Sequence, residues 1–172
     1  DGDGVTDAQE AIDGTDPNNG CSYKSSSQVI ANVSTDWSNA DCDNDGLTNG
    51  EELTGVDNPN TPADPNGVAT NPLNPDTDGD GVSDAQEAID GTDPNNGCDY
   101  KSSSQIIANV SAAWSGVDCD SDGLTNGEEV TGINNPATLA NPNGKITDPR
   151  NVDSDGDGVT DAQEAIDGTD PN

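Results

Sequence analysis

A dense run of acidic side chains constrains this chain more than any other feature. Residues 76–87 read DTDGDGVSDAQE, with oxygen-bearing side chains at places 1, 3, 5, 9 and 12 and glycine at place 6. Neighbouring carboxylates repel one another, and few apolar residues flank the run to oppose that repulsion. A stable fold for this segment therefore needs positive charge among the carboxylates.

The same run recurs along the chain in one register. Complete copies span residues 41–52, 118–129 and 153–164, and a copy that begins at place 3 opens the chain at residues 1–10. A single run could arise by chance, but five in register do not. The repetition indicates that the run is the building block of the fold.

This spacing is that of an EF-hand calcium loop, in which a backbone carbonyl fills place 7 and glycine makes the sharp turn at place 6. We predict about one Ca2+ per loop or more. The predicted ligands, with the carbonyl at place 7 of each loop, are Asp1, Asp3, Val5, Asp7, Glu10, Asp41, Asp43, Asp45, Leu47, Asn49, Glu52, Asp76, Asp78, Asp80, Val82, Asp84, Glu87, Asp118, Asp120, Asp122, Leu124, Asn126, Glu129, Asp153, Asp155, Asp157, Val159, Asp161 and Glu164.

The composition leaves little material for a core. The chain has 35 acidic and 4 basic residues, a net charge of -31, 27% hydrophobic residues and no Phe, Met or His. Such a composition is typical of disordered tails, which is the alternative interpretation. Because the carboxylates lie in loop register, we instead expect calcium to supply the folding free energy and the calcium-free chain to be disordered. The charge also disfavours nucleic acid and anionic membranes as partners, and membrane insertion is not expected because no apolar run approaches the roughly 18 residues of a membrane span.

The sequence repeats every 77 residues, since Asp-Gly-Asp-Gly-Val begins at residues 1, 78 and 155. We predict a first repeat unit at 1–77, with a partial loop, a cysteine segment, a second loop and a Pro/Asn-rich linker. A second unit spans 78–154 and a third starts at 155–172. Because the chain begins inside a loop, we expect it to be a window of a longer array, whose further copies are its expected partners.

The segments between the loops carry few helix signals. Pro and Asn at residues 57–75 favour turns, and a helical stub at residues 8–13 stops at Gly14. We predict mostly irregular, calcium-stabilised tandem repeats with short helical stubs and little or no sheet. Such a chain has no conventional hydrophobic core and is expected to form an elongated rod.

The four cysteines also follow the 77-residue period. We predict the disulfides Cys21–Cys42 and Cys98–Cys119, each within its own repeat, with reduced thiols as the alternative. Disulfides beside calcium loops indicate an oxidising, extracellular location. The segments that they close carry most of the larger apolar residues, among them Trp37 and Trp114, which we expect to form small clusters.

Two sequons lie in these cysteine segments. Asn32-Val-Ser34 and Asn109-Val-Ser111 satisfy the Asn-x-Ser/Thr rule, so Asn32 and Asn109 are candidate glycosylation sites. Such triplets also occur by chance.

The motifs together resemble the bacterial form of the thrombospondin type 3 repeats. The resemblance rests on the acidic loops followed by Gly-Thr-Asp-Pro at 14–17, 91–94 and 168–171, and covers essentially the whole chain. It implies calcium-wrapped modules strung into a stiff stalk or spacer of large secreted surface proteins. The long insertion between Glu52 and Asp76 departs from the family pattern, and Asp57 and Asp64 within it are candidate extra ligands.

We therefore expect a structural calcium-binding array that forms a rigid stalk, fibre or filament segment at the bacterial cell surface. The alternatives are a calcium-dependent protein- or glycan-binding module, similar to an adhesin or a dockerin, and an acidic mineral-binding or calcium-buffering segment. An enzyme is disfavoured because no nucleophile has a base beside it. Loops with Asn49 or Asn126 at place 9 have one charge fewer, and we expect them to release calcium first.

Overall fold

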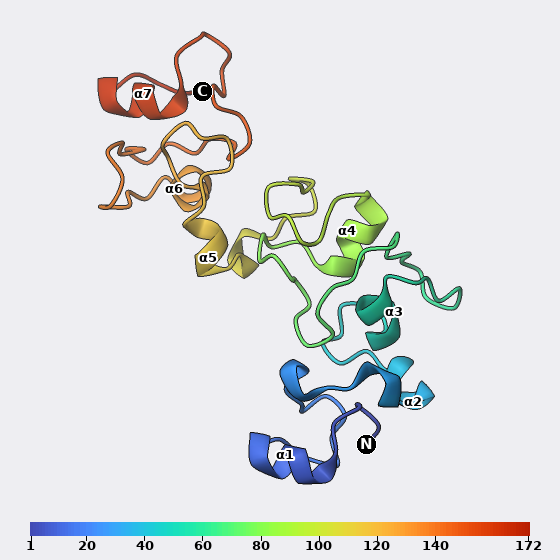
Figure 1. Ribbon diagram of the computed structural model, residues 1–172. Coiled ribbons are helices and arrows are strands. Elements are labelled where there is room, and N and C mark those ends of the chain that lie inside the picture. Colours follow the sequence, from blue (N-terminus) through green and yellow to red (C-terminus); the bar gives the residue numbers. More distant parts are fainter. The chain divides into compact units, whose positions relative to one another are not determined.

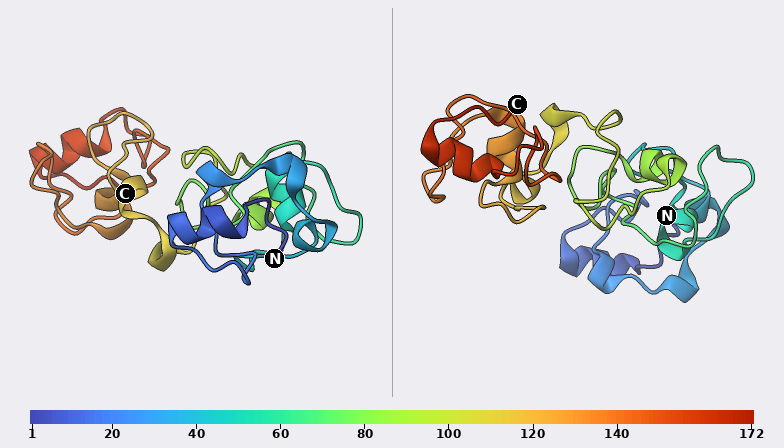
Figure 2. Two further views of the ribbon diagram at one scale, coloured as in Figure 1. Left: turned by 60° about the horizontal axis from the view of Figure 1, so that its bottom comes forward. Right: turned by 90° about the horizontal axis from the view of Figure 1, so that it is seen from above.

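The structure, a computed structural model, describes residues 1–172 and consists of short helices joined by irregular chain, with no β-strand (Figures 1 and 2). This confirms the predicted fold class. Five helices begin at place 9 of a calcium loop, and five still shorter ones lie in the cysteine segments. They are α1 (Asp7–Asp13), η1 (Ser25–Ser27), η2 (Ile30–Asn32), α2 (Thr35–Ser38), α3 (Asn49–Thr54), α4 (Asp84–Asp90), η3 (Ile107–Asn109), α5 (Ala112–Ser115), α6 (Asn126–Thr131) and α7 (Asp161–Asp167).

The helices that follow the loops are bounded by local signals. The residue at place 8 is Thr or Ser, and its hydroxyl caps the first turn, as Thr48 does for α3 by accepting from the Glu51 N–H. In α3 and α6 the Glu three residues on completes a capping box. Each helix then ends at a left-handed glycine, such as Gly55 with φ 69°. The calcium loop and its exit helix are therefore one local unit.

The chain forms two compact units. The first comprises Asp1–Thr77 with Ser83–Asn95, and the second Asp78–Val82 with Asn96–Asn172. These boundaries differ from those of the 77-residue sequence repeat, because α4 belongs to the first unit. There the Ala85 N–H donates to Asp45 Oδ2 at 2.8 Å, and Asn66 Nδ2 donates to the Ala88 carbonyl at 3.1 Å.

Apolar packing is confined to small clusters inside each unit. In the first unit, Leu47, Ala63 and Ala85 form one cluster, and Tyr23 meets Trp37 edge to face at 5.7 Å. The second unit has the same two kinds of apolar cluster. One contains Leu124 and the other contains Trp114. Clusters of this size cannot replace a domain core, so the stability of the fold depends on its acidic loops.

The Pro/Asn-rich insertion of the first unit folds back over α3. The Gly67 N–H donates to the Gly55 carbonyl at 3.0 Å, and the Thr70 N–H donates to the Glu52 carbonyl at 2.8 Å. The Thr61 hydroxyl donates to Glu51 Oε1. The second insertion repeats these contacts on α6 from Gly144, Thr147 and Thr138. Each insertion is thus part of the wall around a calcium loop.

Candidate calcium sites

In the loops, backbone N–H groups donate hydrogen bonds to the loop's own carboxylates, which holds the backbone in its turns. In loop 41–52, Asp41 accepts hydrogen bonds from the N–H groups of Asn44 and Gly46, at 2.7 and 3.2 Å, and Asp45 accepts from the Leu47 N–H at 2.8 Å. Asn44 and Gly46 have positive φ, 64° and 113°, which turns the chain around these side chains. The same bonds recur in loops 118–129 and 153–164.

The acidic side chains converge in each of the four loops that lie within one unit. One carboxylate oxygen from each member lies within 4.8 Å of the others. The clusters are Asp1, Asp3 and Glu10; Asp41, Asp43 and Asp45; Asp118, Asp120 and Asp122; and Asp153, Asp155 and Asp157. The loop 76–87 divides its residues between the units, with Asp76, Asp84 and Glu87 in the first and Asp78, Asp80 and Val82 in the second.

Several carboxylate oxygens at the predicted ligand places, in these clusters and at place 12, are buried without a hydrogen-bond partner. They are Asp3 Oδ2, both carboxylate oxygens of Glu10, Asp43 Oδ2, Glu52 Oε2, Asp120 Oδ2, Glu129 Oε2 and Glu164 Oε2. Buried polar atoms are nearly always satisfied, so repeated exceptions in the same loop places need a cause. Hard oxygen ligands in this arrangement fit Ca2+.

The electrostatics of the ion-free loops agree with that fit. Burial, and then repulsion from Asp43 and Asp45, raises the pKa of Glu52 to about 9. Burial, and then repulsion from Asp120 and Asp122, raises the pKa of Glu129 to about 9 as well. The pKa of Asp43 rises to about 6 through burial and the neighbouring Asp45. The ionised loop is therefore unfavourable until a cation joins it.

In loops 41–52 and 118–129 the glutamate at place 12 has a partner from the insertion. The Thr70 hydroxyl donates to Glu52 Oε1 at 3.3 Å, and the Thr147 hydroxyl donates to Glu129 Oε1 at 3.1 Å. In both cases Oε2 stays without a partner. Sequence reasoning missed these threonines, because each lies 18 residues beyond its glutamate in a segment without periodicity.

Place 9 differs from the other predicted ligand places. Asn49 and Asn126 bond to groups of the neighbouring cysteine segment, and Asp84 and Asp161 bond to the residue at place 2 of their own loop. Asp7 is exposed. Asp84 and Asp161 lie outside the carboxylate clusters, as do the place-12 residues Glu52, Glu129 and Glu164, but each of these glutamates keeps a buried oxygen without a partner. At place 7, Leu47, Val82 and Leu124 bury their side chains in apolar clusters, whereas Val5 and Val159 are more open.

The candidate extra ligands of the insertion lie elsewhere. Asp57 and Asp64 are exposed, and Asp64 accepts a hydrogen bond from the Asn66 N–H at 2.9 Å. Neither belongs to a carboxylate cluster. The insertion serves the loop through Thr70 instead, because that hydroxyl is the group it brings to Glu52.

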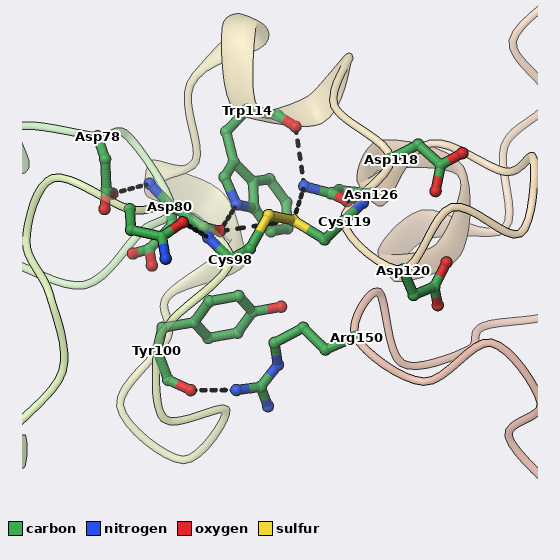
Figure 3. The surroundings of a disulfide bond; sticks show 12 residues. Asp78, Asp80, Cys98, Tyr100, Trp114, Asp118, Cys119, Asp120, Asn126 and Arg150 are labelled. Carbon is green, nitrogen blue, oxygen red and sulfur yellow. Dashed lines mark hydrogen bonds between the residues drawn. A yellow bond between two sulfur atoms is a disulfide. The ribbon is translucent and has the colours of Figure 1, made fainter.

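Both predicted disulfides are present. Cys21 pairs with Cys42 and Cys98 with Cys119, with Cα atoms 5.4 and 5.6 Å apart. Beside each, a buried tryptophan closes the segment: Trp37 Nε1 donates to the Gly20 carbonyl at 2.6 Å, and Trp114 Nε1 to that of Gly97 at 2.5 Å (Figure 3). The sequon residues Asn32 and Asn109 are exposed, and their glycosylation stays a prediction.

In the second unit an arginine side chain adds contacts to the disulfide segment. The Arg150 guanidinium lies over the Tyr100 ring, 4.2 Å from its centroid, and also donates to the Tyr100 carbonyl (Figure 3). It donates to Ser102 Oγ as well. The equivalent place in the first repeat is Leu73, so this contact is specific to the second unit.

The chain belongs to a family of calcium-binding repeats. The family described as "Bacterial TSP3 repeat" matches residues 1–20, 41–55, 76–97, 118–132 and 153–172, which together make up more than half of the sequence and include every acidic loop. This confirms the resemblance to thrombospondin type 3 repeats. Neither the curated proteins nor the solved structures contain a significant match. None of the helices has the length and apolar character of a membrane span.

Proposed function

We propose that this chain is a calcium-stiffened spacer, a segment of a rigid extracellular stalk or filament in a bacterial surface or secreted protein. The observation that carries the proposal is the set of buried, partnerless carboxylate oxygens that stands where an ordinary domain has apolar residues. Calcium bound at each of them supplies the cohesion that the small apolar clusters cannot supply.

The proposed ligands are those predicted at places 1, 3, 5, 7 and 12. Three aspartates at places 1, 3 and 5 come from the start of a loop. The backbone carbonyl at place 7 comes from its middle, and the glutamate at place 12 comes from the first turn of its exit helix. One calcium ion would offset two of the four negative charges that these side chains carry and would fix the start of that helix. In loops 41–52 and 118–129, Thr70 and Thr147 orient the place-12 glutamates, and the insertions cover them.

A structural role accounts for the repetition better than a docking role does. The exit helices α1, α3, α4, α6 and α7 are six or seven residues long, which leaves no extended apolar face for a partner. The two repeats carry the same loops and disulfides, as expected where added copies provide length. The disulfides favour an oxidising location outside the cytoplasm.

Small-angle scattering tests the proposal directly. A compact globule of this length has a radius of gyration of about 16 Å. We expect a clearly larger value with a rod-like profile in millimolar calcium and a coil-like curve after chelation. A compact particle in calcium would contradict the spacer role. The comparison chain carries Glu52→Gln and Glu129→Gln. It keeps both disulfides and the size of the side chains, and it should need more calcium to become rod-like.

A further inference from the structure

The residue at place 9 meets the same partner in all four complete loops. Its side-chain Oδ1 accepts from the backbone N–H at place 2. The distances are 3.0 Å from Cys42 to Asn49, 2.8 Å from Thr77 to Asp84, 3.1 Å from Cys119 to Asn126 and 2.9 Å from Ser154 to Asp161. All four acceptors are 0% exposed. This bond joins the start of the loop to the first turn of its exit helix.

The second polar atom of that side chain depends on what place 2 offers. Where place 2 is Thr77 or Ser154, the hydroxyl donates to Oδ2 of the aspartate at 2.7 Å. A carboxylate, which only accepts, is the right partner for this N–H and O–H pair.

Where place 2 is a disulfide cysteine, the neighbouring groups are acceptors. Asn126 Nδ2 donates to the Trp114 carbonyl at 3.1 Å and to Cys119 Sγ at 3.3 Å (Figure 3). Asn49 makes the equivalent bonds to Trp37 and Cys42. A carboxylate at this place would meet a carbonyl and a sulfur with no donor between them, whereas the amide satisfies both sides.

We propose that place 9 is a positioning residue that clamps each loop shut, and that place 2 dictates whether it is Asp or Asn. The clamp holds the place-1 and place-12 ligands in register, since it ties the chain next to the first to the helix that carries the second. In the cysteine loops it also fastens the calcium loop to the tryptophan of the disulfide segment. This inference rests on calcium binding by the loops and does not depend on the stalk role.

The clamp and a ligand role at place 9 predict opposite results for Asn126→Asp. A ligand gains charge and should bind calcium more tightly. A clamp loses its donors to Trp114 and Cys119, and calcium affinity of loop 118–129 should fall at least about fivefold. The measurement is an NMR calcium titration that follows the Gly123 amide for this loop and the Gly158 amide for loop 153–164 as the internal control. The Trp114 carbonyl and the Cys119 sulfur should repel the new carboxylate from the place where Asn126 Oδ1 accepts from the Cys119 N–H, so hydrogen exchange of the Cys119 amide should accelerate in the variant at saturating calcium.

A second variant keeps the test decisive if Asn126→Asp fails to fold. Ser154 lies at place 2 and is no ligand under either interpretation, but its hydroxyl completes the clamp on Asp161. Ser154→Ala should weaken calcium binding in loop 153–164 about threefold or more through the lost hydroxyl bond. The matched control is Ser154→Thr, which copies Thr77 at place 2 of loop 76–87, keeps the hydroxyl bond and should leave affinity unchanged.

The outcomes separate the possibilities. Tighter binding by Asn126→Asp, or unchanged affinity in both Asn126→Asp and Ser154→Ala, would overturn the clamp alone. No calcium response at Gly123 or Gly158 in the unmodified chain would overturn the calcium role and the clamp together. Weaker binding with faster Cys119 exchange supports the clamp. It would also mean that the charge at place 9 does not set the order in which the loops release calcium.

Discussion

At the scale of single residues, the threonine of the insertion is the residue that most directly orients a proposed calcium ligand. Thr147 is buried, and its hydroxyl donates to one oxygen of Glu129 while the other oxygen has no partner. Thr147→Val keeps the shape and removes the donor. Because such partners orient the ligand, calcium affinity of loop 118–129 should fall roughly tenfold. Isothermal titration or the Gly123 amide shift measures the change.

Thr138→Val is the matched control for that substitution. The Thr138 hydroxyl donates to Glu128, the capping-box residue, at 2.7 Å and makes no bond to Glu129. Its loss should lower the thermal stability of the region around α6 with little effect on calcium affinity. If both variants bound calcium equally, the hydroxyl of Thr147 would have no orienting role.

The raised pKa values of two proposed ligands predict that stability and calcium affinity depend on pH. Burial, and then repulsion from neighbouring aspartates, raises the pKa of Glu52 and Glu129 to about 9 in the fold without a cation, against an ordinary value of 4.5. The ion-free fold therefore binds more protons than the unfolded chain, and its stability falls as pH rises from about 4.5 to about 9. Calcium needs the ionised form. Where a loop loses calcium while its unit stays folded, calcium affinity should therefore rise across the same window with release of protons. Titration calorimetry at pH 6 and pH 8, in buffers of different ionisation enthalpy, measures both effects; a pH-independent affinity without proton release would mean that the loops unfold on losing calcium and that their glutamates return to ordinary pKa values.

At the scale of elements, the fold depends on the close contact between a helix end and its insertion. Gly55 ends α3 with φ 69°, and a Cβ there would lie 2.5 Å from the Gly67 carbonyl carbon. Gly91 ends α4 with φ 76° and has open space around that position. Gly91→Ala should cost about 1 kcal/mol through backbone strain alone. Gly55→Ala should cost roughly 2–4 kcal/mol because it also pushes the insertion away.

Thermal unfolding in saturating calcium compares these two variants. The Gly55→Ala chain should also bind calcium less tightly in loop 41–52, since Thr70 moves with the insertion, whereas the Gly91→Ala chain should not change that loop. Equal losses of stability would show that the insertion does not depend on its contact at Gly55.

The elements also explain what could be predicted from the sequence. The carboxylates at places 1, 3 and 5 bond to N–H groups two to five residues ahead, so their convergence follows from local spacing. The cysteine pairs repeat with the loops. In contrast, Asn126 reaches the Trp114 carbonyl 12 residues earlier, and Thr147 reaches Glu129 from 18 residues later. Those contacts depend on how irregular chain folds back, which no periodic pattern encodes.

At the scale of the whole molecule, the balance is between a charge of -31 and small apolar clusters. Two effects of cations can be distinguished here. Diffuse salt screens the repulsion between loops, over about 10 Å at 0.1 M. Coordinated calcium also satisfies the buried oxygens of residues such as Glu52 and Glu129, which screening cannot do. The fold should therefore need calcium itself and not ionic strength alone.

The test is to remove calcium with excess chelator and then add sodium chloride to about 0.5 M, where screening is nearly complete beyond contact distance. Trp37 and Trp114, 3% and 2% exposed in the fold, report the packing next to the loops through near-UV circular dichroism. We expect chelation to abolish their signal and shift their fluorescence to the red. Salt should contract the chain without restoring the signal, and calcium should restore it. Recovery in salt alone would mean that the acidic loops act through bulk charge, in which case the buried glutamate oxygens would have to be protonated in the fold, as their raised pKa allows.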